Sequence, residues 1–293
     1  MKRSIAVLLT LAPIALLPRT PAARAEVSLV DIAGRDVRVQ VPVKSMILGG
    51  GRFLPSIAIL DRADPIRWVS GMMGEFRQLD PATYDQSRTR FPAIDEIPTI
   101  GRRGADSFSL ETAIAARPEV AIFGLASGHG PNAHHKDILD KLDAAGIPVV
   151  IVDFRIDPLL NTPRSIELLA RLMGREKEAA EFLEFYNDQM NRVRDGLQGV
   201  TERPTVFMES RVGLRDSCCE AIGRHMMGRF IEWAGGQNLV GAKIPGTHGM
   251  VNLEYLLVNQ PDFYIGTAIG SAILPDAAAK RIVLGASADE TLA

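Results

Sequence analysis

One stretch of the sequence occurs twice, once in each half of the chain, and this repeat constrains the fold more than any other feature. Residues 110–122 and residues 253–265 both read Leu-Glu, a short helical stretch, Pro, an acidic residue and then an apolar segment. A proline pushes the residue before it out of the helical region, so each copy predicts a short helix that ends and leads into a strand. The two halves of the chain are therefore predicted to be variants of one α/β plan.

The segments around the two copies also alternate between strand and helix patterns. Short apolar runs predict strands at residues 45–48, 67–70, 119–123, 149–152 and 205–208. Apolar residues at three- and four-residue intervals predict helices at residues 53–60, 139–145, 162–173, 179–197 and 226–233. Thr162-Pro163 predicts the start of the third of these helices, with Thr as its N-cap. Strand, helix and strand in this order is typical of a parallel α/β sheet.

Two consecutive helical patterns separate the strand-rich halves. A helix of about 20 residues is about 30 Å long, which is enough to bridge two small lobes. The sequence therefore predicts an N-terminal α/β lobe over residues 26–157, a helical bridge over residues 158–200 and a C-terminal α/β lobe over residues 201–293.

The beginning of the chain has the pattern of a secretory signal peptide. Lys2 and Arg3 precede an apolar run over residues 5–17, and Ala23-Arg24-Ala25 fits the site that signal peptidase cleaves. The apolar run is too short to span a bilayer as an anchor. We therefore expect residues 1–25 to be removed after Ala25 and the mature chain to reach the periplasm.

Charge and cysteine content exclude several classes of protein. The formal net charge of −2 gives no general case for a nucleic-acid partner, since phosphate binding favours a basic surface. The adjacent Cys218 and Cys219 cannot form a disulfide framework, and they leave three interpretations open: a bond between neighbours, two free thiols, or a turn that contacts a ligand. Gly49-Gly50-Gly51 does not extend to a dinucleotide-binding fingerprint, because Leu54 stands where the third glycine is needed.

From about Val27 onward the chain resembles the iron-complex and cobalamin class of periplasmic substrate-binding proteins of ABC importers. The resemblance is carried by the opening Val30-Asp31-Ile-Ala-Gly34-Arg35, the two repeat copies, Ala145-Gly146-Ile147-Pro148-Val149 and Ala234-Gly235-Gly236-Gln237-Asn238. It implies two Rossmann-like lobes with central parallel sheets, joined by a long backbone helix, with the binding domain at about residues 45–293. Ligand is then held between the lobes, and hinge motion is small.

The glutamate of each copy has two interpretations. Glu111 and Glu254 fall in the first turn of their helices, where a carboxylate stabilises the helix dipole by about 0.3–1 kcal/mol. The resemblance implies a second role, in which both glutamates dock onto arginines of a membrane permease. A partner ATPase then supplies the energy, so the chain needs no nucleotide, cofactor or metal of its own. It is expected to act as a monomer that meets the membrane only through the permease.

Ligand-binding residues are expected in the loops that follow the strands, because ligands of open α/β sheets lie beyond the carboxyl ends of the strands. Arginine is frequent there, and its guanidinium is a rigid donor for carboxylates and other anionic oxygens. A ferric siderophore presents such oxygens. The candidate ligand-binding residues are Arg52, Arg102, Arg103, His129, Arg155, Arg211, Arg215 and His248.

The identity of the ligand is less constrained than the class of protein. Haem and cobalamin favour broad aromatic walls, whereas the aromatic content is 6% and Trp68 and Trp233 fall outside the candidate loops. This favours an iron chelate such as a ferric siderophore, with haem or cobalamin as the alternative. Direct metal capture by His129, His134 and His135 is weighed against solvated loop histidines, because no acidic or cysteine partner has ligand spacing.

Two further hypotheses concern activity and length. An exported enzyme would use Cys218 or Cys219 as nucleophile with His225 or His248 as base, although nothing in the sequence brings these groups together. After the second copy, only a helix around Ala277 and a strand over residues 281–284 are predicted. Proteins of the resembled class continue into a further strand and helix, which leaves the completeness of the C-terminal lobe open.

Overall fold

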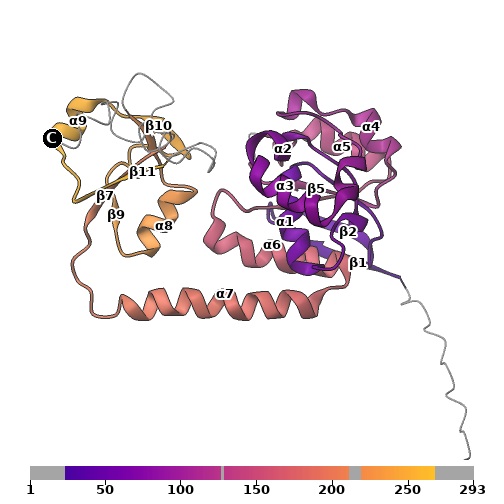
Figure 1. Cartoon of the computed structure of the whole chain (residues 1–293), viewed down its shortest axis with the longest axis horizontal. Coiled ribbons are helices and arrows are strands. Elements are labelled where there is room, and N and C mark those ends of the chain that lie inside the picture. The colour runs from indigo at the N-terminus through magenta and orange to yellow at the C-terminus, as the bar shows by residue number, and fades with distance from the viewer. Residues whose placement is uncertain (1–23, 127–128, 211–218, 268–293) are drawn as a thin grey trace, which may run out of the picture.

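The computed structural model describes residues 24–126, 129–210 and 219–267, and it has two α/β lobes at the two ends of one long helix (Figure 1). The predicted signal peptide, apart from its last two residues, and the helix and strand predicted after residue 267 lie outside the described residues. Within the described residues, no helix combines the length and apolar character needed to cross a membrane.

The N-terminal lobe contains a four-stranded sheet in which all neighbouring strands are parallel. The order is β4-β3-β5-β6, formed by Val69–Met72, Met46–Leu48, Val120–Gly124 and Val149–Val152. These are the four strands predicted for this half, within two residues at each end. The helices of the lobe are α1 (Leu54–Leu60), α2 (Glu75–Leu79), α3 (Pro81–Arg90), α4 (Leu110–Ala115) and α5 (Lys136–Ala144), with short 3-10 turns at Gly51–Phe53, Ile66–Trp68, Pro92–Glu96 and Ala105–Ser107.

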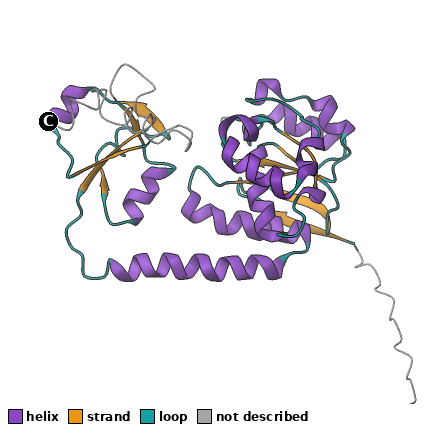
Figure 2. Cartoon of the chain, viewed as in Figure 1, coloured by secondary structure: helices purple, strands orange, loops and turns teal. Residues whose placement is uncertain are grey.

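Both faces of this sheet are buried, because successive side chains of each strand point to opposite faces. Met46, Leu48 and Ile122 pack on one face in a core that includes residues of α1 and α6, the first helix of the bridge (Pro158–Met173). Ile47 and Phe123 pack on the other face with residues of α4 and α5. Figure 2 shows these helices around the strands. Continuous apolar strands are the expected result of covering both faces.

The opening motif of the resemblance forms a hairpin that protects one edge of the sheet. Strands β1 (Ala25–Val30) and β2 (Asp36–Val41) are antiparallel, and the buried Asp31 carboxylate accepts hydrogen bonds from the Arg35 side chain at 2.7 and 2.9 Å. The same carboxylate accepts the Ile151 N–H at 3.1 Å, and Arg35 donates to the Val149 carbonyl at 2.6 Å. The turn thus pairs with the exposed edge of β6, which blocks strand addition from outside.

The helical bridge begins earlier than the sequence predicts. The helix α6 begins at Pro158, with Asp157 as N-cap, and Pro163 lies inside it, so the predicted start at Thr162 is wrong. A proline inside a helix leaves the carbonyl four residues before it without its N–H partner. Here that carbonyl belongs to Leu159, and the Tyr186 hydroxyl donates to it at 2.7 Å. Tyr186 lies on the second bridge helix, α7 (Glu176–Gly196), so a contact distant in sequence makes Pro163 tolerable.

The C-terminal lobe contains a mixed sheet, which corrects the expectation of a parallel sheet in each lobe. Its described strands are β7 (Thr205–Glu209), β8 (Glu220–Ile222), β9 (Gln237–Asn238), β10 (His248–Met250) and β11 (Phe263–Gly266), with helices α8 (Met227–Trp233) and α9 (Leu253–Val258). β9 and β11 are parallel to β7, whereas β8 is antiparallel to both β7 and β10. Only residues 210–219 separate β7 from β8, fewer than the dozen or more that a parallel crossover requires.

The two copies of the repeat fold in the same way. In each, a polar residue before the Leu-Glu pair caps the helix: Ser109 accepts the Thr112 N–H at 3.1 Å and Asn252 accepts the Tyr255 N–H at 3.0 Å. In each, the acidic residue after the proline accepts a backbone N–H close to the start of a central strand of its own lobe, β3 in the first copy and β7 in the second. Glu119 accepts the Lys44 N–H and Asp262 accepts the Thr205 N–H, both at 2.7 Å.

Candidate functional site

Three loops at the carboxyl ends of the N-terminal strands bring basic side chains together. Arg52 follows β3, His129 follows β5 and Arg155 follows β6, and these three strands are adjacent in the sheet. The charges of Arg52, Arg155 and Arg103 all act on the His129 imidazole. Sequence reasoning predicted all four residues as ligand contacts, and the fold gathers them into one group, named here the basic cluster.

Burial and the three guanidinium charges lower the pKa of His129 from 6.5 to about 4. Its imidazole is therefore neutral at physiological pH, and its Nδ1 atom is buried without a hydrogen-bond partner in the described part of the chain. A neutral ring among three fixed positive charges provides an environment that attracts anions. The ring also keeps a free nitrogen lone pair or N–H for a bound group.

The loop that carries Arg52 is held by close backbone packing. A side chain at Gly49 would collide with the Phe123 ring, and one at Gly130 would collide with the Gly49 carbonyl, which places the loop after β5 directly against this glycine run. The buried Glu75 carboxylate accepts the Arg52 N–H at 3.2 Å and also bonds the Gly51 N–H. These N–H groups are therefore already occupied, so the glycines serve packing rather than phosphate binding.

Glu75 is a functional-site residue that sequence reasoning missed. It is 1% exposed, and burial raises the pKa of its carboxyl, with the Gly51 and Arg52 N–H groups opposing that rise. Its Oε2 atom has no hydrogen-bond partner among the described residues. The sequence offers no signal for this role, because Glu75 lies at the start of a short helix far from Arg52 in the chain.

The loop that carries Arg155 is organised by the buried side chain of Asp153. Its carboxylate accepts the backbone N–H groups of Arg155, Ile156 and Asp157 at 2.8–3.0 Å, and the Asn161 amide at 2.8 Å. Four donors satisfy a charge that is 2% exposed, so the loop is fixed before any ligand arrives. A signal for Asp153 was present, since it directly follows the predicted strand at residues 149–152.

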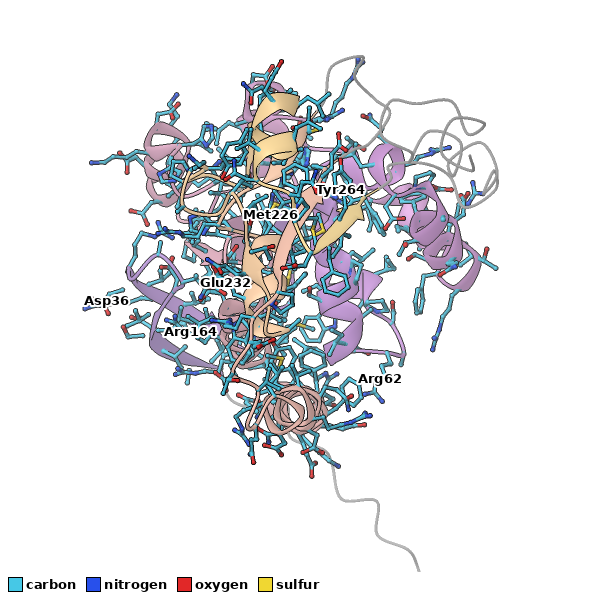
Figure 3. The ribbon with its side chains drawn as sticks, turned by 90° about the vertical axis from the view of Figure 1, so that its left-hand side faces the viewer. Asp36, Arg62, Arg164, Met226, Glu232 and Tyr264 are labelled. Atoms are coloured by element: carbon cyan, nitrogen blue, oxygen red, sulfur yellow. The ribbon has the colours of Figure 1, made fainter. Side chains whose placement is uncertain are left out.

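The same loop contacts the C-terminal lobe. The Met226 N–H donates to the Ile156 carbonyl at 3.2 Å, and the Arg229 guanidinium lies 3.0 Å from the Asp157 carboxylate. Arg229 also pairs with Glu232 at 3.2 Å, and Figure 3 labels Met226 and Glu232 near the two ends of α8. Met226 has φ of 54°, a region that few residues other than glycine adopt. Strain of this kind is held only where the surrounding contacts fix the backbone.

The remaining predicted ligand contacts lie elsewhere. Arg102 is the neighbour of Arg103 in the chain, but it lines a separate cavity in the N-terminal lobe. His248 lies on β10, where it hydrogen-bonds the Thr247 hydroxyl at 2.9 Å. Arg211 and Arg215 lie outside the described residues.

Neither metal capture nor thiol catalysis gains support. The described residues contain no group of three or more histidine, cysteine, aspartate or glutamate side chains arranged for a metal ion. His135 instead bonds Asn132 within its own loop, at 3.0 Å. Cys219 is fully buried and disulfide-bonded, which removes its thiolate as a nucleophile, and Cys218, the only other cysteine of the chain, lies outside the described residues.

The two glutamates of the repeat lie on equivalent, exposed positions. Glu111 and Glu254 occupy the first turns of α4 and α9, and both are exposed. Figure 1 shows these two helices on the same side of the molecule, opposite the long helix α7. A single flat partner could therefore meet both carboxylates at once.

Comparison with known sequences gives one family match. The sequence model described as "Periplasmic binding protein" matches residues 79–272, which cover both copies of the repeat and the whole bridge. No curated protein sequence matches the chain.

Comparison with solved structures gives the same fold at low sequence identity. The TroA-like periplasmic binding protein FepB from Veillonella parvula has a TM-score of 0.70 and 23% identity, over 83% of this chain and 70% of that one. The molybdate-bound periplasmic protein MolA from Haemophilus influenzae has a TM-score of 0.62 and 17% identity, over 81% and 72%. The periplasmic heme-binding protein RhuT from Roseiflexus sp. RS-1 has a TM-score of 0.54 and 21% identity, over 75% of each chain.

Proposed function

Because the chain belongs to the periplasmic binding protein family, whose members are non-enzymatic solute carriers for ABC importers, we propose that it captures an anionic iron chelate. A ferric siderophore with carboxylate or similar oxygens is the ligand class that this proposal names. The chelate binds between the lobes, against the basic cluster of Arg52, Arg103, His129 and Arg155. A permease and its ATPase then receive it.

The basic cluster is the observation that carries this proposal. Three guanidiniums act on one half-buried imidazole at the carboxyl ends of adjacent parallel strands, where open α/β sheets bind their ligands. Guanidiniums bind carboxylate oxygens through paired, charge-assisted hydrogen bonds. A chelate with several anionic oxygens can bond to all three guanidiniums, whereas a neutral solute offers them no opposite charge.

The route into the importer rests on the repeat. Glu111 and Glu254 are exposed on one side of the molecule and have the same position in each lobe. We infer that they dock onto basic sockets of the permease, while the signal peptide predicted over residues 1–25 exports the chain as a periplasmic monomer. The chain brings the chelate and the partner ATPase supplies the energy.

Titration with a defined chelate tests the ligand class. We expect ferric citrate to bind the full chain in isothermal titration calorimetry, and the cationic chelate ferrioxamine B to bind far more weakly. The double substitution Arg52→Gln with Arg155→Gln removes two charged donors, each worth about 1.5–3 kcal/mol, so affinity for ferric citrate is expected to fall at least tenfold. Equal binding of both chelates, or equal binding by the variant, would contradict the proposal. Binding of molybdate alone would assign the cluster to a small oxyanion instead.

Haem is the second candidate, and the state of His129 favours it specifically. A neutral imidazole whose Nδ1 atom has no hydrogen-bond partner among the described residues is competent to bind iron, and nearby guanidiniums suit haem propionates. The two candidates predict different readouts. Haem binding gives a shifted Soret band that His129→Ala abolishes, whereas chelate binding requires the arginines and survives His129→Gln with little loss.

A further inference from the structure

A second site lies in the N-terminal lobe, apart from the basic cluster. A cavity of about 470 Å³ opens beyond the carboxyl end of the edge strand β4, between α2, the start of α3 and the segment at residues 94–102. Cavities of about 300–1,000 Å³ are typical of small-molecule sites. The residues that line it all belong to the N-terminal lobe, so the site is complete without the C-terminal lobe.

The guanidiniums of Arg77 and Arg102 line this cavity, and Arg77 lies over the Tyr84 ring, 5.8 Å from its centroid. The side chains of Arg77 and Arg102 make no hydrogen bond or ion pair with any described residue, and both are exposed. The acidic residue of the cavity, Asp95, is already engaged, because it accepts the Tyr84 hydroxyl at 2.7 Å and lies 4.0 Å from Arg88. Arg77 and Arg102 therefore form no ion pair with the carboxylate of the cavity.

The inner wall of the cavity is aromatic and rich in sulfur. Phe76 and Tyr84 meet edge to face with ring centroids 5.4 Å apart, and the fully buried Met73 lies beside them in the lining. Rings of a ligand pack well against aromatic edges and against methionine sulfur. Burial, followed by the Asp95 contact, raises the pKa of Tyr84 to about 12, so the phenol stays neutral and adds no negative charge.

The neighbouring residues Arg102 and Arg103 belong to different sites. Arg103 acts on His129 in the basic cluster, whereas its neighbour Arg102 lines the cavity. The sequence predicts both residues for one site. The fold divides them, and Arg102 lines the same cavity as Arg77, a residue that the sequence gave no reason to select.

The guanidiniums of Arg77 and Arg102 form no ion pair with any described residue and lie beside an aromatic wall, and from this arrangement we propose that the cavity binds an aromatic monocarboxylate. The carboxylate lies between the two guanidiniums, and the ring packs against Tyr84, Phe76 and Met73. The site is independent of the proposed chelate site, since it shares no residue with the basic cluster.

Benzoate and benzamide test this assignment, because they have nearly the same shape and differ in charge. Titration of the full chain, followed by calorimetry and by NMR contacts between the benzoate ring and the Tyr84 and Met73 side chains, should detect benzoate. Benzamide should bind at least tenfold more weakly. Arg77→Gln with Arg102→Gln should reduce benzoate affinity at least tenfold while leaving the melting temperature unchanged, because both side chains are exposed. Arg77→Lys with Arg102→Lys should retain part of the affinity.

A matched control separates this inference from the proposed function. Arg52→Gln with Arg155→Gln alters the basic cluster and should leave benzoate binding unchanged. Loss of benzoate binding in that variant would place the carboxylate in the basic cluster and overturn the assignment. Equal binding of benzoate and benzamide, benzoate binding unaffected by the Arg77 and Arg102 changes, or the absence of benzoate binding would overturn it as well. Failure of ferric citrate to bind has no bearing on any of these results.

Discussion

The strands in which the two copies of the repeat end, β5 and β11, differ sharply in their surroundings, although the same helix and proline precede each of them. β5 lies between β3 and β6, and every one of its residues is buried. β11 pairs with β7 in the described part of its sheet, and Phe263, Tyr264 and Ile265 are 58%, 36% and 41% exposed. The repeat thus dictates the helix cap, the helix end before the proline and the hydrogen bond that the acidic residue accepts from a backbone N–H. It does not dictate how far the following strand is buried.

Burial depends instead on the elements that the rest of each lobe supplies. The N-terminal sheet has α1 and α6 on one face and α4 and α5 on the other, with two large apolar cores. The described C-terminal sheet has two small cores, and apolar side chains such as Leu257 and Val258 of α9 are exposed. Similar local sequence therefore gives similar local structure and unequal burial.

The largest expected effect comes from substituting the matched isoleucines of the two strands. Ile122→Ala removes a side chain that is fully buried, and such changes cost about 2–5 kcal/mol of unfolding free energy. Ile265→Ala removes a side chain that is 41% exposed, and we expect a cost below about 1 kcal/mol. Urea unfolding followed by circular dichroism measures both. Equal costs would show that β11 is as well covered as β5.

The next effect tests whether the two lobes are equivalent toward a partner. Glu111→Arg with Glu254→Arg should reduce uptake of the transported solute more than tenfold while leaving solute binding unchanged, if both carboxylates dock onto basic sockets. Each single change should have a similar, smaller effect. Glu184→Arg is a matched control, because Glu184 is exposed on α7, on the opposite side of the molecule. If the glutamates serve only the helix dipole, stability falls by about 0.3–1 kcal/mol per site and uptake is unaffected.

The sequence predicted the four parallel strands of the N-terminal lobe and the repeat well, because both rest on local patterns, whereas β1 and β2 were not predicted. A buried parallel strand is a continuous apolar run, and a proline stop acts on its immediate neighbour. The start of α6 was predicted wrongly because Pro163 signals a helix start locally, while its tolerance inside the helix depends on Tyr186 from another helix. The direction of β8 was missed because no strand was predicted between β7 and α8.

The candidate site was predicted in part for the same reason. Loops after buried strands are identifiable in sequence, so Arg52, His129 and Arg155 could be selected before their proximity was known. Glu75 and Arg229 act through contacts between segments distant in the chain, and no local pattern marks them. The division between Arg102 and Arg103 depends on the direction in which each side chain points, which a sequence does not specify.

A smaller effect is expected where the bridge supports the N-terminal lobe. Tyr186→Phe removes the donor that satisfies the Leu159 carbonyl, and an orphaned carbonyl costs about 1–2 kcal/mol. Pro163→Ala restores an N–H that can reach the same carbonyl. In that background Tyr186→Phe should cost markedly less, and a double-mutant cycle by urea unfolding measures the difference. Additive costs would show that the hydroxyl does not compensate for the proline.

The contact between the lobes is expected to matter less for stability than for geometry. Arg229→Met removes the partly exposed ion pair with Asp157, and pairs of this kind contribute below about 1 kcal/mol. We expect a broader distribution of distances between spin labels at Asp140 and Gln260, one exposed site on each lobe. Glu232→Gln, which keeps the pair with Asp157, is the control. An unchanged distribution in the Arg229 variant would show that α7 alone sets the orientation of the lobes.

The smallest expected effect is the pH dependence that His129 gives to the N-terminal lobe. Burial, then Arg52, Arg155 and Arg103, lower its pKa in the folded state from 6.5 to about 4. Above pH 6.5 the imidazole is neutral in both states, so it has no influence on stability. As pH falls from 6.5 toward 4, the unfolded chain binds a proton that the folded chain does not, and the free energy of unfolding decreases.

His129→Gln should therefore flatten the stability profile between pH 6.5 and pH 4, and the advantage of the variant should grow as pH falls. The change in unfolding free energy is expected to be small, because His129 is only half-buried and solvent screens the charges around it. Arg52→Gln removes one of the three charges, so it should raise the pKa of His129 and narrow the pH range over which the free energy of unfolding decreases. An NMR titration of the His129 ring measures that pKa. If Arg52→Gln leaves that titration unchanged, Arg52 does not act on His129, and the basic cluster loses the member that links β3 to the site.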